Sequence, residues 1–373
     1  MFFKSYLRKV LLVSFIMAFL IAITNFFVDP GSIYQKYNFS TQNQTSKEFV
    51  RLAVESKYGV FRPENIFNER DIVREFAIYP VNYDCAIIGS SHVKQMSLLR
   101  NNKSLSSYCK SIKNFGASGA SLEDYLAISN MILNNEFKPK KVIFGIDLWS
   151  LNFGRDKRYV QYKKDYLSMI NLLNNSENVE KSQYKGEFIS IFFNLFNLEY
   201  FYRSLNEIIE PNFSKEIMEA PQFEFEKGLP YDVIMPDGSL VYSSQVIKEA
   251  EIKLENLDGL NDYKLVEGSY FQDYAVGFFI ELVKYLQKNN IEVFFVLIPY
   301  HHSVISNESQ PILKTIDKVT TKIYDLAKLL QVNVIGSYDP NVLQCTKDEF
   351  YDETHPKASC LKKLDNKIEL NEK

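Results

Sequence analysis

The sequence predicts an α/β domain with a doubly wound, mainly parallel sheet flanked by helices, preceded by one N-terminal transmembrane helix. Three observations lead to this class. Apolar runs of strand length alternate with amphipathic helical segments from residue 84 to residue 335. The strand runs are long and apolar, which is typical of strands covered on both faces. An uncharged apolar run precedes them all, at residues 10–27.

That N-terminal run is just long enough to cross a bilayer as a helix. Basic residues precede it at Lys4, Arg8 and Lys9. Because basic residues stay on the cytoplasmic side, we expect a cytoplasmic tip and anchor at 1–30, with the main domain periplasmic or extracellular. A cleaved signal peptide is the alternative, although the run is long for one and no small-residue cleavage site is evident.

Residues 31–80 are mixed and polar, and they predict a stalk or irregular segment. The α/β domain is expected at 81–365. Its strands are expected at 84–89, 111–115, 141–146, 291–298 and 332–335. Its helices are expected at 93–100, 121–134, 271–288 and 311–330. Ser121 is a natural N-cap for the second of these helices.

Residues from 150 to about 270 interrupt this alternation. They contain an aromatic helical stretch at 188–205. A hairpin pattern follows, with strands at 232–235 and 239–242 joined by Pro236-Asp237-Gly238. We expect an insertion or cap over the core, and not an independent domain.

Composition narrows the class of function. The net charge is −3 and the isoelectric point about 6.0, so the chain has no basic field of the kind that attracts nucleic acid. The four cysteines fall into two pairs, Cys85 with Cys109 and Cys345 with Cys360. The first pair would lie at similar height on adjacent parallel strands, and the second would close a short loop. Two disulfides and four unpaired thiols both remain open.

Polar clusters follow the predicted strands. They are Ser90-Ser91-His92, residues 116–119, Asp147, residues 300–302 and residues 352–355. In parallel sheets, ligands bind beyond the carboxyl ends of the strands, so these clusters are expected to meet. A hydroxyl, an acid and an imidazole together can activate a serine nucleophile, and these groups are carried here by Ser91, Asp352 and His355. Ser90 as the exposed hydroxyl, with Ser91 only capping a helix, is the alternative. His92 is expected on the surface of that helix.

These motifs resemble those of the SGNH (GDSL-like) hydrolase superfamily, and most closely its membrane-anchored, cell-envelope branch. That branch includes proteins of alginate O-acetylation and teichoic-acid D-alanylation. The resemblance covers about residues 80–365. Its matching blocks are Gly89-Ser90-Ser91, then Asn114-x-Gly116 with Ser118-Gly119, and last Asp352-x-x-His355.

The resemblance implies a flavodoxin-like sheet, Ser91 as nucleophile, His355 as base and Asp352 as its orienting partner. It also implies the backbone N–H groups of Ser91 and Gly116 as donors to an oxyanion. The third block departs from the pattern, because Asp147 stands where the family has an asparagine donor, and a carboxylate cannot donate unless protonated. Asn152 is a candidate substitute.

Other strand-end residues are candidates for substrate contacts: Asp147, Trp149, Tyr300, His301 and His302. Trp149 suits sugar stacking, with a core position as the alternative. The adjacent histidines suit contacts to substrate hydroxyls, with metal binding as the alternative. No cluster has metal-ligand spacing, and no cofactor is expected.

The resemblance therefore implies a serine esterase or O-acyltransferase, moving acetyl or another small acyl group on a cell-envelope polysaccharide through an acyl-serine. A non-catalytic accessory protein that binds glycan or a membrane acyltransferase is the alternative. A metal-dependent phosphoesterase is more distant.

Overall fold

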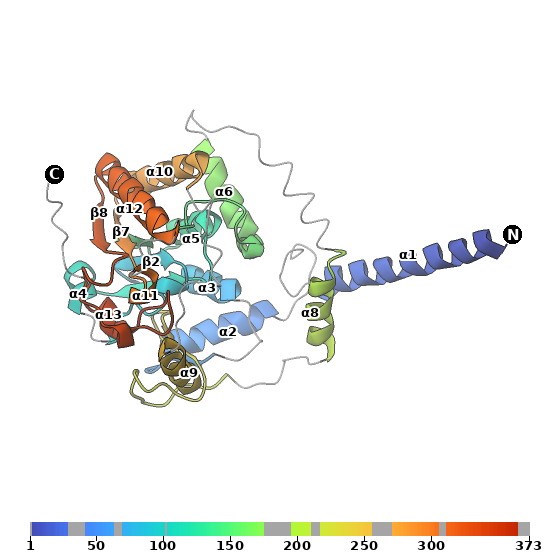
Figure 1. The fold of residues 1–373 in the computed structure, drawn as a ribbon, viewed down its shortest axis with the longest axis horizontal. Helices are drawn as coiled ribbons and strands as arrows, with labels where there is room; N and C mark the ends of the chain where they lie inside the picture. The colour runs from blue at the N-terminus through green and yellow to red at the C-terminus, as the bar shows by residue number, and fades with distance from the viewer. Residues whose placement is uncertain are drawn as a thin grey trace. The chain divides into compact units, whose positions relative to one another are not determined.

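The structure is a computed structural model that describes residues 2–28, 42–62, 69–100, 103–174, 195–209, 217–255, 271–305 and 311–364. The chain divides into two compact units. Unit 1 contains residues 1–45 and 180–216, and unit 2 contains residues 46–179 and 217–373. Figure 1 shows the helices and strands of both.

Unit 1 is built around α1 (Phe2–Val28), an apolar helix near the N-terminus. Its stretch Ser5–Val28 is 24 residues long with a mean hydropathy of 2.5, enough to cross a membrane by length and composition. α8 (Leu198–Ile209) packs against it, and Oδ1 of the buried Asn25 accepts the Ser204 hydroxyl at 3.1 Å. Nδ2 of Asn25 donates to the carbonyls of Leu195 and Asn197, just before α8, at 2.9 and 3.1 Å. Of the expected helical stretch at 188–205, residues 188–194 lie outside the described residues.

Unit 2 contains a five-stranded sheet in the order β3-β2-β4-β7-β8, with every neighbouring pair parallel. The strands are β2 (Cys85–Gly89), β3 (Ile112–Gly116), β4 (Lys141–Gly145), β7 (Glu292–Leu297) and β8 (Asn333–Gly336). The five expected strands and the parallel α/β class are thus confirmed. Because β2 lies between β3 and β4, the winding reverses at β2, and this is where doubly wound sheets bind ligands.

Alternate strand residues pack on opposite faces of the sheet, as the pleat requires. Ala86 and Ile88 face the larger core, to which the long helices contribute. These helices are α3 (Glu69–Ile78), α5 (Leu122–Asn134), α10 (Asp273–Lys288) and α12 (Pro311–Leu330). Cys85 and Ile87 face a smaller core. The expected helices 121–134, 271–288 and 311–330 are confirmed, the first with Ser121 at its N-cap.

The smaller core is covered by two short helices, α4 (Lys103–Tyr108) and α13 (Ala358–Leu361), and by loops. Both disulfides lie on this face of the sheet. Cys85 is bonded to Cys109, and Cys345 to Cys360, which leaves no free cysteine. The cross-links therefore stabilise the face of the sheet that has the least helix packed on it.

Two expectations need correction. The segment expected as an irregular stalk contains α2 (Gln42–Glu55), β1 (Val60–Phe61) and α3, and Phe49 and Val50 of α2 are fully buried in the larger core. The single helix expected at 93–100 is instead two short 3-10 turns, η2 (Ser91–Val93) and η3 (Leu98–Arg100). Asn114 explains this break, since its Nδ2 donates to the carbonyls of Val93 and Met96 at 2.7 and 2.9 Å.

The expected hairpin is confirmed in the insertion. β5 (Val233–Ile234) pairs antiparallel with β6 (Leu240–Val241), and β1 joins them to form a small sheet. The hairpin turn lies on the edge strand β3, where the Asn114 N–H donates to the Asp237 carbonyl at 2.7 Å. Gly238, with a φ of +82°, allows this approach, because a Cβ there would lie 2.5 Å from the Asn114 carbonyl oxygen. The insertion thus covers one exposed edge of the main sheet. It continues into α9 (Ser244–Glu255).

Lys113 on β3 is a buried lysine inside an aromatic cage. Its Nζ lies 5.8, 5.3 and 5.5 Å from the ring centroids of Phe76, Tyr79 and Tyr83. It also donates to the Phe76 carbonyl at 3.1 Å. Burial disfavours the ammonium form and lowers the pKa of Lys113 to about 7, from an ordinary value of 10.5.

This shift predicts a pH dependence of stability. Between pH 7 and 10.5, the unfolded chain holds a proton that the folded chain has released, so the free energy of unfolding rises with pH. From about pH 7 to pH 9, we expect the wild type to gain about 2 kcal/mol relative to Lys113→Met, since one pKa unit is about 1.4 kcal/mol. Denaturant unfolding of the full chain in micelles at the two pH values measures this. Parallel pH curves for the two proteins would contradict it.

Candidate active site

The turn after β2 presents a serine above the sheet, and two glycines make room for it. η2 lies over the ends of β2 and β4, with Val93 packed on both strands. A Cβ at Gly145 would lie 2.2 Å from Cγ1 of Val93, and a Cβ at Gly89 would lie 2.9 Å from it. Any side chain at these positions would push the turn away from the sheet. Glycine at positions 89 and 145 is therefore a steric requirement of the turn.

Ser90 and Ser91 have different roles in this turn. Ser90 is fully buried, and its Oγ accepts the N–H of His92 at 3.2 Å as the N-cap of η2. Ser91 is partly exposed, and its Oγ lies 2.8 Å from Nε2 of His355. The alternative in which Ser91 caps the helix and Ser90 is exposed is thus not what the structure shows.

His355 is fixed at its other nitrogen by Asp352. Nδ1 of His355 lies 2.9 and 2.8 Å from the two carboxylate oxygens of Asp352. Oδ1 also accepts the backbone N–H groups of Thr354 and His355, each at 2.8 Å. Burial acts to raise the pKa of Asp352, but the hydrogen bonds and charge of His355 outweigh it and hold that pKa below its usual range. A carboxylate only accepts, so the His355 proton is on Nδ1 and Nε2 is the acceptor for the Ser91 hydroxyl.

The loop that carries this pair is closed on itself at several points. The Tyr351 N–H donates to the His355 carbonyl at 2.8 Å, and the Lys357 N–H to the Glu349 carbonyl at 2.8 Å. The disulfide from Cys345 to Cys360 spans the whole loop. The loop is tied to the end of β7 by the His301 N–H, which donates to the Glu353 carbonyl at 2.9 Å.

The oxyanion donors differ from those expected. The Ser91 N–H, at the first position of η2, has no acceptor among the residues that the structure describes, so it is open to a ligand. The Gly116 N–H is engaged, because it donates to Oδ1 of Asn114 at 2.9 Å in an Asx turn. The N–H groups of Ala117 and Ser118 donate to the Gly89 carbonyl and Oε2 of Glu69. The prediction that the Gly116 N–H donates to an oxyanion is therefore corrected, because this N–H is already engaged.

Asp147 and His92 also differ from expectation. Both are only 2% exposed, and Nδ1 of His92 lies 2.6 Å from Oδ1 of Asp147. Asp147 is thus bound to a neighbouring side chain and does not face a substrate, and His92 is buried instead of exposed. Sequence analysis missed the pair because a histidine that follows a strand-end serine has many surface roles. The signal was the acid at the end of β4, which needed a donor.

Three other candidates for substrate contacts are buried. Trp149 is 7% exposed and donates from Nε1 to the Ala120 carbonyl, so its alternative core position is the correct one. Tyr300 is fully buried against Tyr338. His301 is 4% exposed, and burial lowers its pKa to about 4, so it is neutral at neutral pH. His302 is partly exposed, and its contact with substrate stays a prediction.

Asn152 is held away from the oxyanion role. Its Oδ1 accepts the Gln272 N–H at 2.8 Å, which fixes the start of α10. Within the described residues, no contact joins Asn152 to Ser91 or His355.

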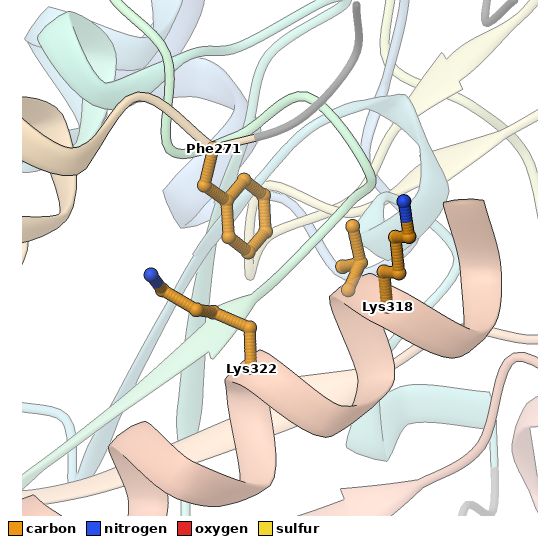
Figure 2. Close-up of a pocket in the computed structure, with 4 residues that line it drawn as sticks. Phe271, Lys318 and Lys322 are labelled. Carbon is orange, nitrogen blue, oxygen red and sulfur yellow. The ribbon is translucent and has the colours of Figure 1, made fainter. Parts of the chain in front are cut away.

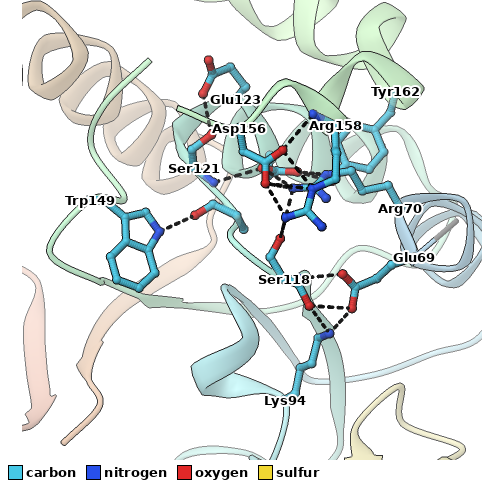
Figure 3. A network of polar contacts seen from close by, with 12 residues as sticks. Glu69, Arg70, Lys94, Ser118, Ser121, Glu123, Trp149, Asp156, Arg158 and Tyr162 are labelled. Carbon is cyan, nitrogen blue, oxygen red and sulfur yellow. Dashed lines mark hydrogen bonds and ion pairs between the residues drawn. The ribbon is translucent and has the colours of Figure 1, made fainter. Parts of the chain in front are cut away.

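A network of charged side chains, some of them buried, contacts the turn after β3 (Figure 3). Nζ of Lys94 contacts Oε1 of Glu69 and donates to Oγ of Ser118 at 3.0 Å. Arg158 donates to the Ser118 carbonyl at 2.7 Å. Arg70, fully buried, pairs with Asp124 at 2.8 Å. The network joins the residue after η2, the start of α3 and the turn after β3. The glycines at the end of β3 do not predict these charged contacts from the sequence.

A pocket of about 160 Å³ lies elsewhere, between the start of α10 and α12 (Figure 2). Its lining consists of Phe271, Lys318, Val319 and Lys322, and does not include Ser91, Asp352 or His355. Across the described ranges, no three His, Cys, Asp or Glu side chains gather closely enough to hold a metal ion.

Comparison with known proteins adds no assignment: no protein-family model matches the chain, and no curated protein matches it significantly. A serine hydroxyl in contact with an imidazole that is itself held by a carboxylate is able to attack an electrophilic carbonyl.

The fit of Val93 against β4 predicts a coupled effect on stability. Gly145→Ala should lower the free energy of unfolding by about 1–3 kcal/mol, because the new Cβ overlaps Val93. Val93→Ala removes the atom in the way, so the loss in the double variant should be smaller than the sum of the single losses. Denaturant unfolding of the three variants measures this. Additive losses would show that the two sites do not compete for space.

The two disulfides should differ in their effect on Ser91. Replacing either pair by serines should cost about 3 kcal/mol, from the length of the loop that each closes. Only Cys345→Ser with Cys360→Ser should also slow the labelling of folded protein by a fluorophosphonate, by roughly tenfold, because that loop positions His355. Cys85→Ser with Cys109→Ser is the matched control. Equal labelling rates in the two double variants would contradict the prediction.

Proposed function

We propose that this chain is a membrane-anchored serine esterase or O-acyltransferase of the SGNH type, acting outside the membrane on a cell-envelope polysaccharide. The observation that carries the proposal is the continuous contact from Ser91 through His355 to Asp352, with distances of 2.8 Å on both sides of the imidazole. The strand order and the position of the three side chains beyond the strand ends support it. The apolar helix α1 supports the anchor, and two disulfides suit an oxidising compartment.

The proposed reaction follows from these groups. Nε2 of His355 takes the proton of the Ser91 hydroxyl as Oγ forms a bond to the acyl carbon. Asp352 stabilises the imidazolium, and the Ser91 N–H donates to the oxyanion. The ester C–O bond then breaks, and His355 returns the proton to the leaving alcohol. Water or a sugar hydroxyl next attacks the acyl-serine, with His355 again acting as base. Acetyl or another small acyl group suits a transfer between envelope components, by analogy with the family.

A second candidate is a non-catalytic accessory protein that binds glycan or a membrane acyltransferase. Two observations favour it: Asp147 replaces an amide donor, and the Gly116 N–H is taken by Asn114. Both lessen the stabilisation of an oxyanion.

The deciding experiment is hydrolysis of p-nitrophenyl acetate by the full chain in detergent micelles. We expect Ser91→Ala and His355→Ala each to reduce kcat/KM by about a thousandfold or more, because nucleophile and base act as one unit. Lys157→Gln, at an exposed position, is the control variant, and it should keep the wild-type kcat/KM. A fluorophosphonate should label the wild type and not Ser91→Ala. No hydrolysis and no labelling of wild type would favour the accessory function.

A further inference from the structure

We infer that His92 and Asp147 form a second histidine–carboxylate pair whose role is to position His355. This inference rests on the proposed function, since it concerns the same serine. Its first support is location, because His92 directly follows Ser91 and Asp147 lies at the end of the neighbouring strand. The pair is buried behind the reactive groups, with both side chains 2% exposed.

The contact with His355 is a ring contact. The His92 ring lies edge-to-face on the His355 ring, with centroids 5.0 Å apart and an interplanar angle of 85°. Trp149 and Tyr300 pack on His92 in the same manner, at 5.4 and 5.8 Å. His92 is therefore confined by three rings, and one of them is the imidazole that must stay aligned between Ser91 and Asp352.

Asp147 contacts one ring nitrogen of His92. Nδ1 of His92 lies 2.6 Å from Oδ1 of Asp147, which is ion-pair distance, and that nitrogen has no hydrogen-bond partner of good geometry among the described residues. The backbone of Asp147 is itself held, because its N–H donates to Oγ of Ser150 at 2.8 Å. That Oγ also accepts the hydroxyl of Tyr125 at 2.8 Å, from the core helix α5. A rigid series of contacts thus runs from the core to the flank of His355.

The contact with His92 gives Asp147 a role other than that of the amide donor it replaces. An acid at the end of β4 cannot donate to an oxyanion, but it can accept from a histidine. The residue at this strand end thus acts on the base and not on the oxyanion. Misplacement of a catalytic group by about 1 Å can lower the rate about a hundredfold, so loss of the alignment of His355 should be measurable as a slower reaction at Ser91.

A double-mutant cycle on the full chain in micelles tests this. The variants are His92→Gln, Asp147→Asn and both together, and the readouts are the rate constant of fluorophosphonate labelling at Ser91 and the melting temperature. We expect each single variant to label about 10–100-fold more slowly, with the double variant no slower than the slower single one. Asp165→Asn, a half-buried carboxylate on α6 (Lys163–Asn174) that binds Asn130, is the matched control.

Each other outcome is decisive. Labelling rates equal to wild type with a lowered melting temperature would show a merely structural pair and overturn the inference. Multiplicative slowing in the double variant would show two independent effects and overturn the coupling. Failure of wild type to label at all would overturn the proposed function together with this inference, whereas rapid labelling of wild type with unaffected variants would overturn the inference alone.

Discussion

The hydrogen bond between Ser91 and His355 joins residues 264 positions apart, and the candidate site exists only because both ends of that contact are held. The Ser91 end is held by steric fit, through glycines that let η2 rest on the sheet. The His355 end is held by a loop with its own disulfide, a short antiparallel bridge between Phe350 and Pro356, and a carboxylate that accepts three N–H groups. The sheet supplies the common frame.

Much of this frame could be predicted from the sequence. Strands buried on both faces give apolar runs, so the five core strands and the three long helices were recognisable, as was the hairpin from its Pro-Asp-Gly turn. The contact among Ser91, His355 and Asp352 could be predicted because a hydroxyl, an imidazole and an acid form the set that activates a serine nucleophile. The role of α2 was missed because its apolar residues, such as Phe49 and Val50, lie between polar ones that suggested a stalk.

Side-chain contacts between distant segments were beyond the sequence. Asn114 shows why: its amide ends a helix expected at 93–100 and also takes the N–H of Gly116. The Asn114 side chain thus accounts both for the absence of the expected helix at 93–100 and for the engagement of the Gly116 N–H. His92 gives the same lesson, since its burial depends on an acid 55 positions away that only the strand order brings near. Such choices are made by tertiary satisfaction of polar groups, and not by local propensity.

The pairing of the cysteines has a consequence for how the protein is made. Each bridge joins cysteines that are consecutive in the sequence, the first with the second and the third with the fourth. A chain that emerges N-terminus first and oxidises its thiols in order of appearance therefore reaches the native pairing directly, with no isomerase step. His355 lies inside the last loop to be closed. A polypeptide that has not yet been extended to His355 consequently contains Ser91 without its imidazole partner.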